Sequence, residues 1–386
     1  MRSGPAHLLA AVLLAGCAQT VLPSGAPVPA LPADSVEASL YLVGDAGDPN
    51  PTGEPVLIAL TAELSRAPQK SLALFLGDNV YPAGIPDSSD SDYAEMRRRL
   101  VAQVNAVTAS GARGIFIPGN HDWERMGKGG WKAVLRAQAI VKEVGAGRVV
   151  QLPADGCPGP AVSDIGPVRL VLLDTQWWLQ GDPRPEGVAD GCVAGEPGVM
   201  DSLAALLSRP DRQVTIVAGH HPVVSGGQHA GYFGWKDYFF PLLNVKPWLW
   251  LPLPVIGAIY PATRNMGISR QDESNSHYRR MIDSLDAAFS ASPPAAYVSG
   301  HDHGMQVIET SPAPWQVVSG AGYYGHIDFV SPVKGSRVTL AKSGFMRIDA
   351  TPGGRLRLSV LTVDREGRAT EVAAMWLTAT MRSAPQ

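Results

Sequence analysis

Short apolar runs alternate along the chain with longer segments that have helical periodicity. Apolar runs bounded by turn residues are typical of strands, and apolar positions three or four residues apart are typical of amphipathic helices. The runs predict strands at 39–43, 71–76, 113–118, 168–173, 213–218 and 295–299 and helices at 54–67, 93–110, 132–144, 199–208 and 276–290. Runs at 344–350, 355–363 and 370–377 predict antiparallel strands that close a second sheet. This alternation indicates an α/β fold.

Five of the predicted strands run directly into a short polar motif. The motifs are Gly44-Asp45-Ala46-Gly47, Gly77-Asp78-Asn79-Val80-Tyr81, Gly119-Asn120-His121-Asp122, Gly219-His220-His221-Pro222 and Gly300-His301-Asp302-His303. In open α/β sheets, ligands bind beyond the carboxyl ends of the strands. We therefore expect the five loops to meet at one site.

Most side chains in these motifs are of types that bind metal ions. The candidate ligands are Asp45, Asp78, Tyr81, Asn120, His220, His301 and His303. A single Gly-Asp after a strand is usually only a turn, so one motif alone says little. The five motifs in this order, each after a strand, are specific for a metal centre.

Composition narrows the class of protein. Hydrophobic residues make up 45% of the 386 residues, which allows a large core and excludes global disorder. The formal net charge is −3 and no basic run occurs, so we do not expect a nucleic-acid-binding protein. No stretch after the N-terminal segment has about 18 uninterrupted apolar residues, so we expect no internal membrane span.

The N-terminal segment has the pattern of a bacterial export signal. Leu14-Ala15-Gly16-Cys17 resembles the lipobox of lipoproteins, in which the chain is cut before the cysteine and the cysteine is acylated. We expect a signal peptide over 1–17, a lipid on Cys17, a proline-rich tether over 18–38 that reaches up to about 50 Å, and one domain over 39–386. Ala18 is not the aspartate that retains lipoproteins in the inner membrane, which favours the outer membrane. Ordinary secretion is the alternative.

Two cysteines remain besides Cys17. Cys157 and Cys192 lie in glycine-containing loops, and exported proteins commonly pair such cysteines. We predict a disulfide bond between them, with two free buried thiols as the alternative.

The five motifs make the chain resemble the calcineurin-like metallophosphoesterases over about 39–324. Most members of that superfamily have Asp-x-His in the first motif, whereas this chain has Asp45-Ala46-Gly47 and carries Tyr81 three residues after Asp78. The Asp-Asn-x-Tyr pattern is similar to that of purple acid phosphatases, in particular the small, tartrate-resistant type. The resemblance implies a four-layer αββα sandwich, in which two mixed sheets are flanked by helices.

The resemblance also implies a binuclear metal centre. Asp45, Asp78, Tyr81 and His303 would hold a ferric ion, and Asn120, His220 and His301 would hold iron, zinc or manganese, with Asp78 as the bridge. Carboxylate and phenolate oxygens suit ferric iron, whereas imidazole and amide groups suit a divalent ion.

Further residues receive roles in the same way. His121 would contact the phosphoryl oxygens or protonate the leaving group. Asp122 would orient His121 by accepting a hydrogen bond, or it is only a turn residue. His229 would line the substrate cleft, or it lies on an exposed loop. We expect His221 to face away from the metals and His326 to be a candidate for the cleft rim.

The expected reaction is hydrolysis of a phosphomonoester by a metal-bound hydroxide. One alternative is a phosphodiesterase of the same fold, and another is a non-catalytic, surface-tethered metal-binding lipoprotein.

An insertion at about 231–270 departs from the family and is rich in tryptophan and proline. It either packs over the edge of the fold or forms an exposed aromatic lid that shapes the cleft or touches lipid.

Overall fold

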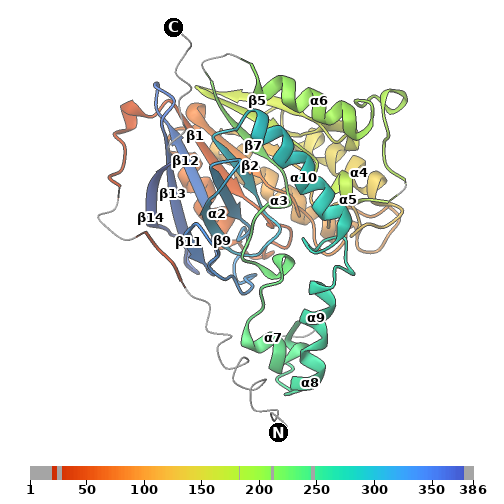
Figure 1. Ribbon diagram of the computed structural model, residues 1–386. Helices are drawn as coiled ribbons and strands as arrows, with labels where there is room; N and C mark the ends of the chain where they lie inside the picture. Colours follow the sequence, from red (N-terminus) through yellow and green to blue (C-terminus); the bar gives the residue numbers. More distant parts are fainter. Residues whose placement is uncertain (1–19, 24–27, 182, 210–212, 245–247, 378–386) are drawn as a thin grey trace.

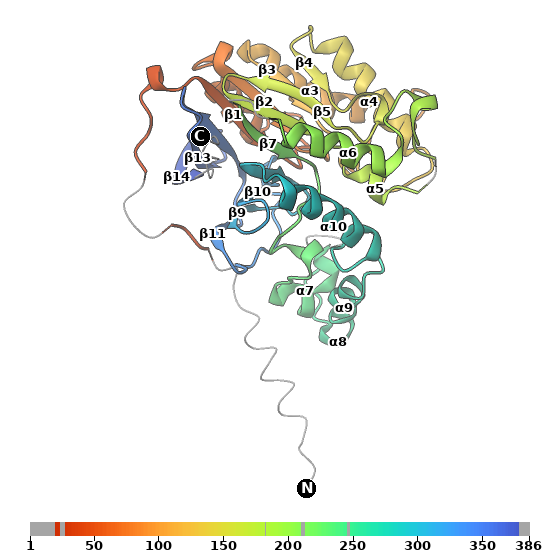
Figure 2. The ribbon, with the colours of Figure 1, turned by 45° about the horizontal axis from the view of Figure 1, so that its top comes forward.

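Two seven-stranded mixed sheets lie face to face in the computed structural model, which describes residues 20–23, 28–181, 183–209, 213–244 and 248–377. Helices cover both outer surfaces (Figures 1 and 2). The chain therefore has the four-layer αββα architecture that the family resemblance implies.

The first sheet has the order β14-β13-β12-β1-β2-β3-β4. Its strands are β1 (Ala38–Val43), β2 (Ser71–Phe75), β3 (Arg113–Phe116), β4 (Val149–Gln151), β12 (Gly344–Ala350), β13 (Leu356–Val363) and β14 (Ala369–Leu377). β1 to β4 are parallel, and β12 joins β1 in antiparallel register, with Leu40 opposite Ile348. The expectation that the C-terminal strands close a second sheet is wrong, because they extend the sheet that β1 begins.

The second sheet has the order β11-β9-β10-β8-β7-β6-β5. Its strands are β5 (Ala161–Ile165), β6 (Val168–Leu172), β7 (Val214–Ala218), β8 (Ala296–Ser299), β9 (Met305–Glu309), β10 (Trp315–Ser319) and β11 (Ser336–Leu340). β6, β7 and β8 are parallel, so their carboxyl ends lie on one edge. The facing surfaces of the two sheets bury aliphatic side chains such as Leu42, Leu74, Leu170 and Val298.

The described α-helices are α2 (Pro55–Leu64), α3 (Tyr93–Ser110), α4 (Gly130–Val144), α5 (Gln176–Leu179), α6 (Gly195–Leu207), α7 (Trp235–Phe239), α8 (Pro254–Gly257), α9 (Ile259–Asn265) and α10 (Ser276–Ala291). All but α7, α8 and α9 belong to the two outer layers. α2, α3 and α4 pack on the first sheet around the stacked rings of Phe75 and Phe116. α5, α6 and α10 pack on the second sheet, where Trp177 and Trp178 are buried. No helix among the described residues is long and apolar enough to cross a membrane.

Local sequence explains where the long helices begin and end. The Glu54 side chain accepts a hydrogen bond from the backbone of Val56, and Pro55 occupies the first turn of α2. The Asn275 side chain caps α10 in the same way. Gly111 ends α3 with a φ of 77°, a left-handed conformation that glycine adopts without steric cost.

Two short stretches of the predicted tether contact the domain. Val21 forms an antiparallel bridge with Thr339 of β11, with both backbone hydrogen bonds at 3.0 Å. The buried Arg357 guanidinium donates to the carbonyls of Val28 at 2.8 Å and Pro29 at 2.9 Å. These residues of the expected tether over 18–38 are thus held against the domain, and the lipobox itself lies outside the described residues.

Cys157 and Cys192 form the predicted disulfide bond, with their Cα atoms 5.4 Å apart. The bond joins the loop before β5 to the loop before α6, so it closes a 35-residue stretch of chain. Free thiols at these positions are thus excluded.

The segment 231–270, which we call the aromatic segment, leaves the body of the molecule through α7 and returns through α9 (Figures 1 and 2). Trp248 is 72% exposed and Trp250 is 54% exposed. The structure therefore favours the exposed interpretation over an insertion that packs on the edge of the fold.

Candidate metal centre

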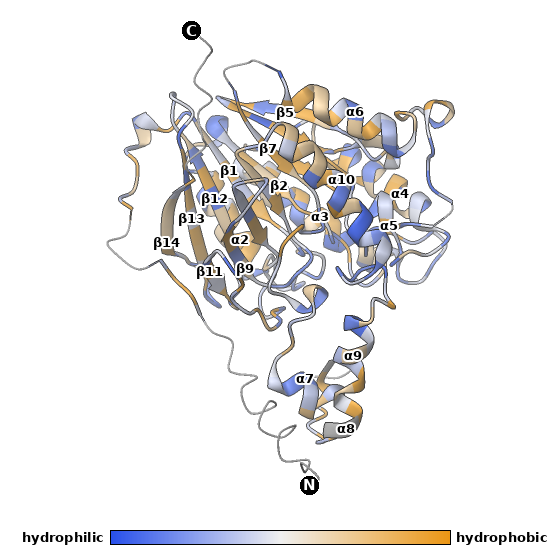
Figure 3. Cartoon of the chain, in the orientation of Figure 1, coloured by the Kyte–Doolittle hydropathy of each residue, from blue (hydrophilic) through white to orange (hydrophobic). Residues whose placement is uncertain are grey.

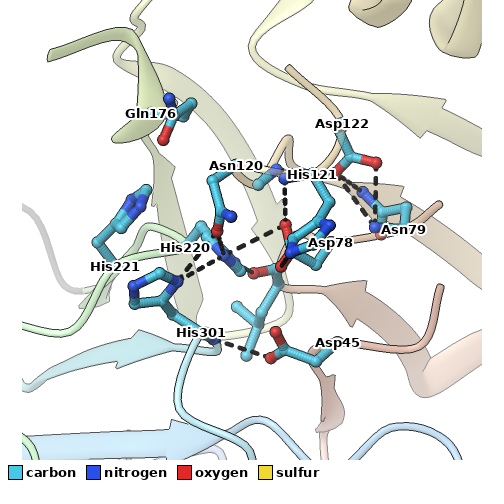
Figure 4. A network of polar contacts seen from close by, with 12 residues as sticks. Asp45, Asp78, Asn79, Asn120, His121, Asp122, Gln176, His220, His221 and His301 are labelled. Atoms are coloured by element: carbon cyan, nitrogen blue, oxygen red, sulfur yellow. Dashed lines mark hydrogen bonds and ion pairs between the residues drawn. The ribbon is translucent and has the colours of Figure 1, made fainter. Parts of the chain in front are cut away.

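Asp45 and Asp78 lie immediately beyond β1 and β2, in left-handed turns with φ of 59° and 53°. These turns direct the two carboxylates across the ends of the strands (Figure 4). The glycine before each aspartate has no side chain, so neighbouring groups can pack directly against its backbone. A Cβ atom on Gly77 would collide with the His220 ring, and Gly77 itself has a φ of 93°.

Asn120, His220 and His301 form one group of ligand atoms (Figure 4). Asn120 Oδ1 lies 3.0 Å from His220 Nε2 and 3.1 Å from His301 Nδ1, and the two ring nitrogens are 3.2 Å apart. The other nitrogen of each ring faces a backbone carbonyl: His220 Nδ1 lies 2.7 Å from Leu76 O, and His301 Nε2 lies 3.1 Å from Gln271 O. If each outer nitrogen carries the proton, the inner nitrogens remain free to bind a metal.

Asp45, Tyr81 and His303 form a second group. The Tyr81 hydroxyl lies 3.2 Å from Asp45 Oδ1 and 3.3 Å from His303 Nε2, which is itself 3.6 Å from Asp45 Oδ1. The Nδ1 atom of His303 lies 2.8 Å from Asp328 Oδ2. Asp328 therefore sets the orientation of this ring, as Leu76 and Gln271 do for the rings of the first group.

Asp78 lies between the two groups. Its Oδ1 atom is 3.4 Å from His220 Nε2, and ligand atoms of Asp45, Asp78 and His220 all lie within 4.8 Å of one another. All three residues are buried. A carboxylate in this position has two oxygens available for two neighbouring cations.

Burial and neighbouring charges shift the pKa values of the ligand side chains. Burial raises the pKa of the Asp45 carboxyl to about 6. Burial also raises the pKa of Tyr81 well above its usual value, and the nearby Asp45 and Asp78 add to this effect. Burial alone would lower the pKa of His303, but Asp328 and Asp45 outweigh it and raise the pKa to about 9. Metal binding must therefore displace protons from Tyr81 and His303.

The donor set fits two metal ions of different hardness. Asp45, Tyr81 and His303 offer a carboxylate, a phenol and one imidazole, whereas the other group offers one amide and two imidazoles. The oxygen-rich group suits a trivalent ion and the nitrogen-rich group suits a divalent one. Buried carboxylates at this density would repel one another without cations, which also favours occupation.

His121 lies beside the two groups, from the same loop as Asn120. Its backbone N–H donates to Asp78 Oδ1 at 2.8 Å, its Nδ1 atom lies 2.6 Å from Pro82 O, and its Nε2 atom lies 3.8 Å from Asp78 Oδ2. The ring is partly exposed, with its Nε2 edge near the carboxylate. Because Pro82 O can only accept, Nδ1 carries the proton of the neutral ring, and Nε2 donates only when the ring is an imidazolium.

Asp122 does not orient His121, so that expectation is wrong. The Asp122 carboxylate accepts hydrogen bonds from the backbone of Gly119, Asn79 and Val80 and from the Asn79 side chain, at 2.8 to 3.1 Å. It thus ties the loop after β2 to the loop after β3. The Pro82 carbonyl holds the His121 ring instead, and Asp122 acts through the backbone that carries Asp78 and Asn120.

His229 lies against the nitrogen-rich group. Its ring centroid is 3.7 Å from that of His301, and its Nδ1 atom is 2.8 Å from Gln271 O and from Arg264 Nη2. The Arg264 guanidinium, from α9, also pairs with buried Asp272. The structure therefore brings His229 to the site, as expected, and fixes it through residues that the motifs do not include.

Two other histidines flank the centre. Both ring nitrogens of His221 have partners, Thr175 Oγ1 and Gln271 Oε1 at 2.8 Å each, which leaves neither free for a metal. His326 packs against the His303 ring in a tilted arrangement with centroids 3.9 Å apart, and its ring centroid lies 5.3 Å from that of Tyr81. His326 thus lies beside the oxygen-rich group.

Sequence patterns did not indicate Asp328 and Gln271. Asp328 lies within the irregular stretch between β10 and β11. Gln271 acts through its carbonyl at His301 and His229 and through its side chain at His221. Every residue type has a backbone carbonyl, so the sequence could not have indicated that the carbonyl of Gln271 contacts these rings.

An αββα sandwich with two adjacent groups of metal ligands at its strand ends is typical of metal-dependent phosphoesterases. The family model for calcineurin-like phosphoesterases matches residues 39–250, which is more than half of the chain. The chain belongs to this family.

Among the solved structures that align with the chain, two with a TM-score of 0.50 or more share the fold at low sequence identity. GAP50, the anchor in the inner membrane complex of Plasmodium, aligns with a TM-score of 0.50 and 14% identity over 88% of each chain. Purple acid phosphatase PPD1 from yellow lupin (Lupinus luteus) seeds aligns with a TM-score of 0.52 and 13% identity over 90% of this chain and 56% of the lupin chain. A dimetal phosphatase from Danio rerio has a TM-score of 0.45 and 12% identity over 89% of this chain and 99% of its own. No curated protein matches the sequence.

Proposed function

We propose that the chain hydrolyses phosphomonoesters with a binuclear metal centre. The observation that carries this proposal is the pair of adjacent ligand groups with buried Asp78 between them. Asp45, Asp78, Tyr81 and His303 would hold a ferric ion, and Asn120, His220 and His301, with Asp78, would hold iron, zinc or manganese. When bound, such ions supply Lewis acidity and a water of low pKa.

The protein side chains around the centre would bind and orient the substrate. His121 Nδ1 donates to Pro82 O, so Nε2 carries a proton only when the ring is an imidazolium, and in that form it would donate to a phosphoryl or leaving-group oxygen. His229, held by Arg264 and Gln271, lines the other side of the site beside His301. His121 would contact the ester from the side of Asp78, and His229 would contact it from the side of His301. We assign leaving-group protonation to His121 and substrate positioning to His229.

Steady-state kinetics on a monoester and a diester test the substrate class. The wild-type protein, purified with its native metals, should hydrolyse 4-nitrophenyl phosphate with a higher kcat/KM than bis(4-nitrophenyl) phosphate. A reversed preference would replace the proposal with a phosphodiesterase. Absence of activity in metal-loaded protein on either ester would favour a non-catalytic metal-binding role.

A matched pair of asparagine variants tests the site itself. Asn120→Ala removes one ligand of the nitrogen-rich group and should lower kcat/KM by about 100-fold or more. Asn105→Ala removes an exposed asparagine of α3 and should leave kcat/KM unchanged. Equal kinetics for the two variants would contradict the assignment.

We also propose that the exported protein carries a lipid on Cys17 and faces the periplasm or the cell surface from the outer membrane. Because Val21 is already hydrogen bonded to β11, only three residues separate it from Cys17. Four residue steps span at most about 14 Å. A lipid on Cys17 would therefore hold the domain close to the membrane. In the wild type the protein should fractionate with membranes, and Cys17→Ser should release it into the soluble fraction.

A further inference from the structure

The aromatic segment, 231–270, carries most of the exposed large hydrophobic side chains of the described residues. Among the described residues, fifteen large hydrophobic side chains are exposed, and nine of them belong to this segment. Met266 is 75% exposed, and Trp248, Trp250, Leu251 and Ile259 are each more than half exposed. Figure 3 shows hydrophobic residues on α8 and α9, far from either sheet. An apolar surface concentrated in one projecting segment marks a contact site for a partner.

The segment presents this surface on a framework of its own. The Phe240 ring lies 5.9 Å from the Trp235 ring and 5.4 Å from the Trp250 ring, which ties α7 to the chain before α8. The Arg264–Asp272 pair attaches α9 to the body. These internal contacts hold the segment away from the domain and leave its outward side chains without cover from the described parts of the chain.

The charges of the segment suit an anionic or zwitterionic lipid surface. Its sequence contains four basic residues and a single acidic one, Asp237; of the basic ones, Arg264 is paired with Asp272 and Arg270 donates to the carbonyl of Leu179. The Asp237 side chain is buried and accepts a hydrogen bond from the backbone of Gly234. Exposed Lys236 lies 5.4 Å from the Trp250 ring, so a cation borders the aromatic surface. Tryptophan and tyrosine beside basic residues are typical of the headgroup region of bilayers.

The segment also lies near the point where the described chain begins. Ser331 N donates to Gly226 O, and the Phe329 ring lies against Gly234, so the loop before β11 packs on the base of the segment. Val21 pairs with β11 itself. In both Figures 1 and 2, β11 and α7–α9 lie toward the same end of the molecule. A membrane that anchored the N-terminal region would therefore lie on the side to which α7–α9 project.

We propose that the outward face of the aromatic segment binds the surface of a phospholipid bilayer. Trp248, Trp250 and Leu251 enter the boundary between headgroups and acyl chains, about 5–10 Å deep, and Lys236 remains among the phosphates. The segment does not span the bilayer, because its helices have only four to seven residues. This contact is a second attachment besides any lipid on Cys17, and it fixes the orientation of the domain, which a single flexible anchor does not.

Quenching of tryptophan fluorescence by brominated lipids tests the proposal on the full exported chain. The protein is added to vesicles of phosphatidylethanolamine with a minority of phosphatidylglycerol, some of whose acyl chains carry bromine. We expect quenching, and bromine near the carbonyl end of the chains should quench more than bromine near the methyl end. The double variant Trp248→Phe, Trp250→Phe should lose most of the quenching.

Trp131→Phe is the matched control, because Trp131 lies on α4 at the outer face of the first sheet and donates to Asp155 O at 2.9 Å. This variant should be quenched like the wild type. The variants leave the metal ligands intact, so their activity on a soluble ester should equal that of the wild type. An unquenched wild type, or equal quenching of the double variant and the wild type, would overturn the proposal. A dimer in solution that dissociates in the double variant, without lipid quenching, would identify a second copy as the occupant and would also overturn it.

Discussion

Replacement of Asp328 by alanine should weaken the metal site that contains His303. Asp328 Oδ2 lies 2.8 Å from His303 Nδ1, and the opposite nitrogen of the ring faces Asp45 and Tyr81. Removal of a carboxylate that orients a ligand histidine typically weakens metal binding by about 10- to 100-fold. Asp328→Asn keeps an acceptor near Nδ1 without the charge, so its loss should be smaller.

The size of the effect should depend on pH. Asp328 is one of the groups that raise the pKa of His303 to about 9, so a proton competes with the metal below that pH. The alanine variant relieves part of this competition, which offsets part of the loss at neutral pH. The difference in affinity between wild type and variant should therefore widen as the pH rises toward 9.

Dialysis against a graded chelator series, followed by metal analysis, measures the effect. The variant should release one of its two ions at a chelator concentration about 10- to 100-fold lower than the wild type, and should retain the other ion as the wild type does. Asp286→Asn, on α10, is the control and should behave as the wild type. Unchanged release from the alanine variant at pH 8.5 to 9 would refute the inference that Asp328 positions a metal ligand.

Three further predictions address the ligand set and the framework. Tyr81→Phe removes the phenolate but keeps the ring, so the visible charge-transfer band of a ferric site should vanish; a wild type that is colourless with ferric iron bound at that site would contradict the role of Tyr81. Asn120→Ala should keep the band while activity falls, as judged by absorption and kinetics on one sample. Replacement of Cys157 and Cys192 by serine should lower the free energy of unfolding by about 3–4 kcal/mol, since the bond closes a 35-residue stretch. Denaturant titration measures this change, and added reductant should destabilise the wild type but leave the variant unaffected.

The motifs at the strand ends were predictable because their chemistry is local. Asp45, Asp78 and Asn120 each follow a short apolar strand, and the strand ends place them at a common edge without further information from the rest of the chain. The same holds for the long helices, whose periodicity and capping residues lie within the segment. Cys157 and Cys192 were predictable by a different route, since only two cysteines remain once Cys17 is set aside.

The placement of β12 to β14 required the tertiary structure. Their apolar pattern indicates strands but does not indicate which free edge they join, and only the antiparallel pairing of β12 with β1 decides it. The same reason applies to the segment around Val21, whose contact with β11 is a backbone pairing that any residue can make. Asp122 also has a role that its neighbours in sequence did not reveal, because its partners belong to two loops.

The sequence by itself therefore determined the fold class, the ligand residues to consider and the disulfide partners. Only the tertiary structure decided which groups orient those ligands: the carboxylate of Asp328 and the carbonyls of Leu76, Pro82 and Gln271. The physical reason is that a ligand type is a property of a side chain, whereas its orientation depends on acceptors brought from distant parts of the chain. The exposure of Trp248 and its neighbours is likewise a tertiary property, because an apolar run has the same sequence whether it is buried or exposed.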